Sequence, residues 1–229
     1  AAGDYLKDNL NTAIAVVEPI ECPTLLYNGF GEHNIQGIGD KHVPLIHNVM
    51  NTDFVIGVSD QATNNLNLLF NTDIGQKYLT AKKGLSLQFV NRLPEFGFSS
   101  IANILASIKL AKYMKLGAED AIITVATDGA ELYLTELEKS KKEFIGSYDM
   151  HACAEIYGQY MKAATIDNMI ELNQKDKERI FNLGYYTWVE QQGIDLREFE
   201  ARRNQSFWDG HLKKMLDLDK LIDQFNTAT

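Results

Sequence analysis

The heptapeptide FVIGVSD, residues Phe54–Asp60, decides the fold class of this 229-residue chain. Its apolar run predicts a buried strand, and the polar pair Ser59 and Asp60 predicts a helix directly afterwards, since either side chain can cap a first turn. A second run, AIAVVEP at Ala13–Pro19, is closed by a proline and predicts another buried strand. A third, AIITVATDG at Ala121–Gly129, ends in a turn signal and predicts a third strand.

Residues 99–117, SSIANILASIKLAKYMKLG, have the apolar periodicity of a helix between the last two predicted strands. The apolar face carries Ile101, Ile104, Leu105, Ile108 and Ala111. Lys109 and Lys112 are predicted to lie off this face, and Gly117 is predicted to end the helix. Strand, crossover helix and strand in this order predict an α/β layered domain with a parallel sheet.

Beyond about Lys139 the sequence predicts helices and no further strand. The chain is therefore predicted to divide into an α/β part, residues 1–139, and a helical C-terminal extension, residues 140–229. We expect the extension to pack on the α/β part or on a partner subunit.

Composition excludes several classes of partner. The net charge of −9 and a pI near 5.0 leave no basic surface for nucleic acid or anionic lipid. No apolar run reaches the roughly 18–20 residues that span a membrane. Cys22 and Cys153 lie far apart and predict no disulfide framework, which fits a reducing cytoplasm.

The segment GEHNIQGIGDKHVP, Gly31–Pro44, is rich in glycine and histidine. Gly37 and Gly39 could begin a dinucleotide-binding fingerprint, but no strand precedes them and His42 stands where the third glycine is needed. The chain also lacks the glycine-lysine-serine/threonine triplet of a phosphate-binding P-loop. From the residues alone, this segment is a tight turn or a loop that closes over a ligand.

Potential metal ligands occur in two groups without a suitable spacing. They are His33, His42 and His47, and Asp149, His151, Cys153 and Glu155. Ligand pairs on a helix need spacings of three or four residues, whereas His42 and His47 are five apart. The second group alternates at spacing two, which would align all four side chains only on a strand, and the surrounding sequence predicts a helix that scatters them. No metal site is predicted.

Five segments, in this order, resemble the second half of the cysteine synthase family, whose members are fold-type-II enzymes that use pyridoxal 5′-phosphate. The segments are GDYLKDNLNTAIAVVEP, HNIQGIGDKHVP, DFVIGVSDQA, GFSSIANILASIKLAK and IITVATDGAELYLT, together covering about residues 3–135. The resemblance implies part of a tryptophan-synthase-β-like layered domain, from a bacterial branch with a helical C-terminal extension.

The resemblance also implies roles for two of these segments. Gly37, Ile38 and Gly39 would line the mouth of the active site, where glycine lets the main chain approach an amino-acid substrate. Ser99 would hydrogen-bond the pyridine nitrogen of the cofactor, with Ser100 as the alternative. A neutral hydroxyl leaves that nitrogen largely unprotonated, which suits β-elimination and β-replacement. The simpler interpretations are a plain turn and a helix-capping serine.

The turn after the third predicted strand departs from the family pattern. Gly129 occupies a position where relatives tend to have a serine, and Asp128 and Tyr133 are weaker site candidates. The family's Schiff-base lysine and phosphate loop precede the first residue of this sequence, and Lys41 is not at the lysine's position. The catalytic lysine is thus expected outside this chain. We expect the C-terminal part of an enzyme, inactive alone, which needs its N-terminal segment in the same gene product or as a separate chain.

The implied function is a pyridoxal-phosphate-dependent lyase or transferase acting on a cysteine- or serine-like amino acid. Threonine synthase-like or ammonia-lyase chemistry is one alternative, and a non-catalytic assembly subunit on the same fold is another. The implied partners are a small amino-acid substrate and a second copy in a homodimer. The aromatic residues Tyr185, Tyr186 and Trp188 could serve that interface or the core.

Overall fold

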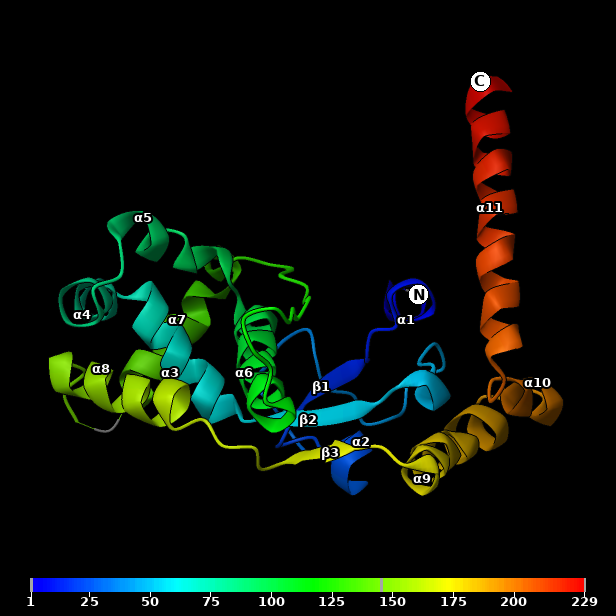
Figure 1. The fold of residues 1–229 in the computed structure, drawn as a ribbon, viewed down its shortest axis with the longest axis horizontal. Helices are drawn as coiled ribbons and strands as arrows, with labels where there is room; N and C mark the ends of the chain where they lie inside the picture. The colour runs from blue at the N-terminus through cyan, green and yellow to red at the C-terminus, as the bar shows by residue number, and fades with distance from the viewer. Residues whose placement is uncertain (1, 145, 229) are drawn as a thin grey trace. The chain divides into compact units, whose positions relative to one another are not determined.

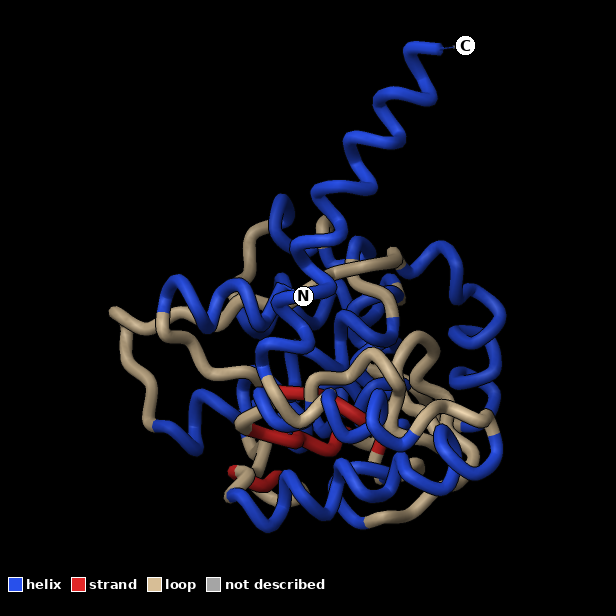
Figure 2. Tube along the Cα trace, turned by 90° about the vertical axis from the view of Figure 1, so that its right-hand side faces the viewer, coloured by secondary structure: helices blue, strands red, loops and turns tan. Residues whose placement is uncertain are grey.

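The computed structural model describes residues 2–144 and 146–228 as a mixed α/β protein with one small sheet and many helices (Figure 1). The strands are β1 (Ala15–Pro19), β2 (Phe54–Val58) and β3 (Met169–Glu171), in the order β1-β2-β3. They are short, as the red segments in Figure 2 show, and helices make up much more of the chain.

The pair β1–β2 is parallel, as predicted. The amide of Phe54 donates to the carbonyl of Ile14 (3.0 Å), and the amide of Ile20 donates to the carbonyl of Val58 (3.0 Å). Residue numbers therefore rise in the same direction on both strands, as in a parallel ladder. Every residue of β2 is buried, which explains why this strand reads as an uninterrupted apolar run.

Strand β3 lies in the region for which no strand was predicted. The amide of Gly57 donates to the carbonyl of Asn168, and the amide of Leu172 donates to the carbonyl of Asp53, both at 2.7 Å. Residue numbers rise on one strand as they fall on the other, so β3 is antiparallel to β2. The prediction of a purely helical C-terminal region is wrong at these three residues.

The predicted strand at 121–129 is wrong. These residues are irregular, and Ile123 and Val125 are 73% and 65% exposed. A strand requires a neighbour that completes its hydrogen-bond ladder, and residues 121–127 make no backbone–backbone bond within the described part of the chain. Side-chain bonds reach them instead, from Asn103 Nδ2 to the carbonyl of Val125 (3.1 Å) and between the hydroxyls of Ser99 and Thr127 (3.1 Å).

The α-helices and shorter helical turns account for most of the remaining chain. The α-helices are α1 (Ala2–Leu10), α2 (Thr24–Tyr27), α3 (Asp60–Asn71), α4 (Asp73–Lys83), α5 (Leu87–Val90), α6 (Phe98–Met114), α7 (Leu134–Glu143), α8 (Met150–Ile156), α9 (Gln174–Tyr185), α10 (Leu196–Ala201) and α11 (Gln205–Ala228). The 3₁₀ turns are η1 (Val49–Asn51), η2 (Leu93–Glu95) and η3 (Ala130–Tyr133), and the π-helical turns are η4 (Tyr157–Lys162) and η5 (Tyr186–Gln191).

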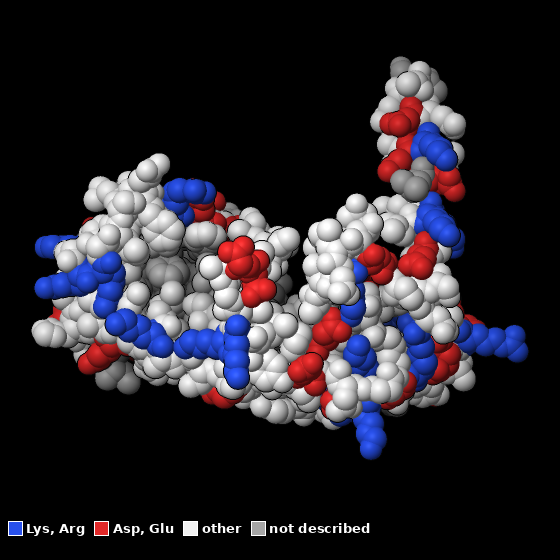
Figure 3. All heavy atoms as spheres, in the orientation of Figure 1, with Lys and Arg blue, Asp and Glu red and all other residues white. Residues whose placement is uncertain are grey.

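Two helices can be compared directly with their predicted ends. Ser59 caps α3, because its hydroxyl accepts the amide of Ala62 (3.1 Å), as predicted. Helix α6 ends earlier than predicted, at Met114, where Lys115 adopts the left-handed conformation that glycine was expected to supply. On the face shown in Figure 3, acidic and basic side chains are interspersed along α11.

The chain forms two compact units, each made of separate segments. Unit 1 comprises Ala1–Val16, His42–Val55 and Glu171–Thr229, and unit 2 comprises Val17–Lys41 and Ile56–Ile170. Within unit 2, α3 packs against α4, α6, α7 and α8. The predicted division at residue 139 stays a prediction, and α7 runs through that position without a break.

Lys109 is a buried cation in unit 2. Its side chain was predicted to lie off the apolar face of α6, but the residue is 8% exposed. The ammonium donates to the carbonyl of Gly57 (2.9 Å) and pairs with Asp167 (3.4 Å). Burial lowers the pKa of Lys109, and the Asp167 carboxylate opposes that shift.

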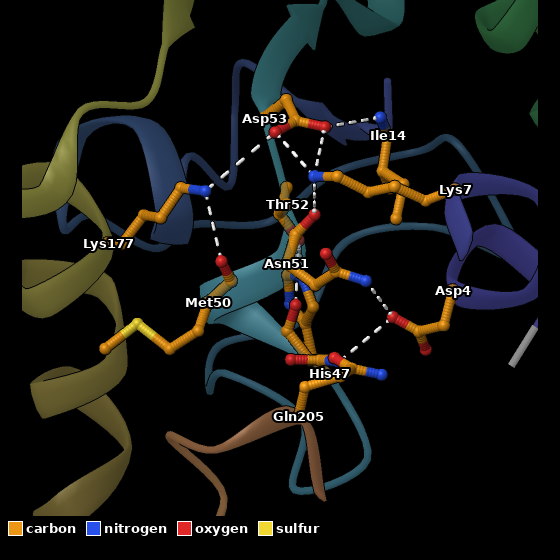
Figure 4. Close-up of polar contacts among 11 residues, drawn as sticks. Asp4, Lys7, Ile14, His47, Met50, Asn51, Thr52, Asp53, Lys177 and Gln205 are labelled. Atoms are coloured by element: carbon orange, nitrogen blue, oxygen red, sulfur yellow. Dashed lines mark hydrogen bonds and ion pairs between the residues drawn. The ribbon is translucent and has the colours of Figure 1, made fainter. Parts of the chain in front are cut away.

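Asp53 is the centre of a polar network in unit 1 (Figure 4). Both of its carboxylate oxygens accept from Lys7 Nζ at 2.7 Å, and one accepts the amide of Ile14 at 2.8 Å. Lys177 Nζ lies 3.9 Å from the same carboxylate and donates to the carbonyl of Met50 (3.0 Å). These bonds fasten α1 and α9 to the start of β2.

His47 lies in the same region, with its Nε2 2.9 Å from the hydroxyl oxygen of Thr52. The Thr52 hydroxyl donates to the carbonyl of Asn48 (3.1 Å), so the imidazole nitrogen acts as the donor to Thr52. Burial, with a smaller contribution from the positive charge of Arg202, lowers the pKa of His47 to about 4 against the opposing effect of Asp4.

Acidification should therefore destabilise the protein through His47. The folded pKa lies below the unfolded value of about 6.5, so stability contributed by the neutral ring is complete above pH 6.5 and is lost as pH falls through 4. Between pH 7 and pH 4 the native protein should lose about 3 kcal/mol more unfolding free energy than the variant His47→Gln. Urea unfolding across this range measures the difference. An identical pH dependence in the two proteins would contradict the assignment.

Candidate functional site

The glycine-rich loop is held to the start of α3 by one carboxylate. Asp60 accepts the amide of Asn34 through Oδ2 (2.6 Å) and the amide of Ile35 through Oδ1 (3.0 Å). Asn34 Nδ2 also donates to Asn64 Oδ1 (3.0 Å), and Ile35 is fully buried. Charge-assisted bonds to a carboxylate are stronger than neutral ones, so the loop is fixed immediately before its glycines.

A second carboxylate supports the first. The amide of Asp60 donates to both oxygens of Glu21 at 3.1 Å. Burial raises the pKa of Glu21, and the bond from the Asp60 amide opposes that shift. The start of α3 is therefore held on both sides, by Glu21 at its amide and by the loop at its side chain.

Gly37 lies against Ser99, so the structure brings together two predicted site residues. A Cβ atom on Gly37 would be 3.5 Å from Ser99 Oγ and 3.6 Å from Ser99 Cβ. Gly37 has φ +90°, a conformation that glycine adopts readily. Ile38 is partly exposed beside it.

Gly39 makes a still closer approach within unit 2. Its φ is +91°, and a Cβ there would lie 2.7 Å from His33 Nε2 and 2.8 Å from Pro19 Cγ. A side chain would overlap both neighbours. Gly39 is thus required by its surroundings whether or not a ligand binds.

Ser99 forms a hydroxyl pair with Thr127, a residue that sequence reasoning missed. The two oxygens are 3.1 Å apart, and Ser99 is 7% exposed. Ser99 is not the helix cap, because α6 begins at Phe98 with Gly97 in the cap position. Ser100 is buried beside it, and its hydroxyl has no hydrogen-bond partner among the described residues.

The turn at 128–133 packs against the start of α6. The amide of Gly97 donates to the carbonyl of Asp128 (2.8 Å), and a Cβ on Gly97 would lie 2.6 Å from Tyr133 Cε2. Tyr133 donates its hydroxyl to Asp128 Oδ2 (3.2 Å) and meets Phe98 edge-on, with ring centroids 5.0 Å apart. Burial raises the pKa of Tyr133, and Asp128 adds to the shift. Asp128 and Tyr133 thus bond to each other within the turn.

The remaining candidates, Gly129 and two lysines, have other surroundings. A Cβ on Gly129 would meet only the flexible carboxylate of Glu131, which can move aside, and the φ of −87° is open to any residue, so this position does not require glycine. Lys41 is exposed. Lys109 follows Ser99 by ten residues of α6, which separates their α-carbons by about 15 Å. Within residues 2–144 and 146–228, no cluster of three potential ligands could hold a metal ion.

A separate cavity of about 320 Å³ occurs in unit 2. Its lining includes Ser59, Lys109, Tyr160 and Asp167 but none of the predicted cofactor- or substrate-contacting residues. The hydroxyl pair, the glycine loop and this cavity are therefore different features of the unit. Both cysteines are free and buried, and no described helix is long and apolar enough to cross a membrane.

Comparison with known proteins supports a relationship to cysteine synthase-like, pyridoxal-phosphate-dependent enzymes, which confirms the resemblance predicted from the sequence. A relative that the chain matches is cysteine synthase B of Campylobacter jejuni subsp. jejuni, 36% identical over 134 residues. The match covers 58% of this chain and 38% of the relative. No protein-family profile matches the chain.

Alanine substitution at two glycines separates backbone strain from crowding. Gly84 has φ +68° and open space around it, so Gly84→Ala should cost about 1 kcal/mol of unfolding free energy. Gly39→Ala adds overlap with His33 and Pro19 and should cost at least about 2 kcal/mol. Urea unfolding of both variants tests this order. Equal costs would contradict the close packing at Gly39.

Proposed function

We propose that these residues supply the cofactor-ring and substrate-loop side of a pyridoxal-phosphate-dependent lyase or transferase. The supporting observation is the position of Gly37 against the Ser99–Thr127 hydroxyl pair. The identity to cysteine synthase B and the parallel β1–β2 pair agree with a fold-type-II domain. The proposed reaction class is β-elimination or β-replacement on a cysteine- or serine-like amino acid.

The hydroxyl pair fits the pyridine end of the cofactor. Only one of the two hydroxyl protons is used in the bond between Ser99 and Thr127, so the other can be donated to a ring nitrogen. A neutral donor leaves the nitrogen largely unprotonated. Ser100, whose hydroxyl is unpaired among the described residues, is the alternative donor. Bound pyridoxal phosphate supplies the electron sink for bond cleavage in the amino acid.

The proposed substrate contact is the backbone of Gly37, Ile38 and Gly39. Because the two glycines carry no Cβ, their peptide groups can approach a carboxylate or amine closely. Asp60 orients this backbone by holding the preceding amides, which limits the conformational entropy lost when a ligand is bound.

The covalent attachment site is proposed to lie on a segment outside these residues. Neither Lys41 nor Lys109 fits this role. Lys41 is exposed, and Lys109 lies further along α6 than Ser99 and donates to the carbonyl of Gly57. Activity would then require that segment, in one gene product or as a second chain. Threonine synthase-like and ammonia-lyase reactions would use the same ring contact, and substrate assays on the complete enzyme would separate them.

The ring contact can be tested without a lysine. 4′-Deoxypyridoxine 5′-phosphate has the cofactor's ring and phosphate but no aldehyde, so it binds only non-covalently. Loss of one hydrogen bond, worth about 1 kcal/mol, should weaken its binding about fivefold in Ser99→Ala and in Thr127→Val. Fluorescence titration measures the dissociation constants.

Ser107→Ala is the matched control, because the Ser107 hydroxyl donates to the carbonyl of Asn103 within α6 (2.8 Å). Its affinity should equal that of the native protein. Equal affinity in all four proteins would contradict the ring contact.

A further inference from the structure

Helix α11 carries an exposed apolar stripe. The helix has 24 residues, about 36 Å in length, and belongs entirely to unit 1. Met215, Leu218 and Ile222 are 54%, 51% and 55% exposed, and Leu212 and Leu221 are exposed as well. Large contiguous apolar surfaces on a soluble protein usually mark an interaction site.

The spacing of the stripe is that of a coiled coil. Met215 and Ile222 are seven residues apart, as are Leu218 and Phe225, and Leu218 follows Met215 by three. They therefore occupy alternating a and d positions of a heptad repeat. Trp208 occupies the preceding a position, but its indole donates to the carbonyl of Arg202 (2.9 Å) within unit 1. The exposed seam therefore begins after Trp208.

Opposite charges flank the seam on its two edges. In this frame Lys214 is a g residue and Asp219 is the e residue of the following heptad. Both side chains are exposed, and neither has an ion pair or hydrogen bond within the described residues. By contrast, Lys220 and Asp217, which lie away from the seam, pair with each other at 3.0 Å.

We propose that α11 forms a parallel two-stranded coiled coil with α11 of a second copy of this chain. In a parallel pair, each g residue faces the e residue of the partner's following heptad. Lys214 of one copy then lies beside Asp219 of the partner, and the two-fold axis repeats this pair. The stripe and the charges on its edges are thus complementary to themselves.

An antiparallel pair does not have this complementarity. There, g residues face g residues and e residues face e residues, so Lys214 cannot lie beside Asp219. The charges therefore select the parallel arrangement, in which a second copy supplies the opposite charge for both Lys214 and Asp219. The seam is short, so the dimer should form in a concentration-dependent way.

Charge reversal at the edges gives a specific test. Lys214→Glu places a second carboxylate opposite Asp219 in each pair, and Asp219→Lys places a second ammonium opposite Lys214. Each variant alone should dimerise about tenfold more weakly than the native chain, since two attractive pairs become two repulsive ones. An equimolar mixture of the two variants should regain native affinity as a heterodimer, because both pairs are then attractive. The introduced glutamate of one chain faces the introduced lysine of the other, and the unchanged Asp219 faces the unchanged Lys214. Sedimentation equilibrium measures these affinities.

Two controls accompany the mixture. Lys213→Glu changes a charge away from the seam and should dimerise like the native chain, whereas Leu218→Asp should abolish dimerisation. Circular dichroism confirms that each exposed substitution leaves the fold intact. A monomeric native chain at all concentrations, or a mixture no tighter than either variant alone, would overturn the proposal. Neither result depends on cofactor binding.

Discussion

The carboxylate of Asp60 is the constraint on which the candidate site depends. It stands where the buried strand β2 passes into α3, and it accepts the amides of Asn34 and Ile35. Without it, the glycine-rich loop would have no charged anchor on α3. With it, the loop reaches Gly37 in a fixed conformation against Ser99.

The two sides of the site are a glycine-containing loop and the first turn of a helix, and each has its own structural requirement. The loop uses glycine, because its backbone has positive φ at Gly37 and Gly39. The opposite side uses the first turn of α6, where the turn containing Asp128 bonds to Gly97 and brings Thr127 to Ser99. Neutral hydroxyls beside a glycine-containing backbone suit a planar nitrogen heterocycle and a small amino acid, in agreement with the proposed chemistry.

Sequence reasoning succeeded where local pattern controls structure. The strand at Phe54–Val58 and its helix cap Ser59 follow from a short apolar run and one hydroxyl. It failed where partners are distant. The run at 121–129 resembles a strand in composition but has no ladder partner among the described residues, and β3 is three residues of edge strand inside a helical region. The burial of Lys109 depends on Gly57, which the periodicity of α6 cannot indicate.

The most direct test of the proposed site is an NMR measurement of the distance between loop and helix. A nuclear Overhauser effect should connect the α-protons of Gly37 with the β-protons of Ser99 in the native protein. In Asp60→Asn this effect should weaken, and the amides of Asn34 and Ile35 should exchange with deuterium faster. If the effect is absent, or is unchanged in Asp60→Asn, Asp60 does not hold the loop at the hydroxyl pair and the proposed site is wrong.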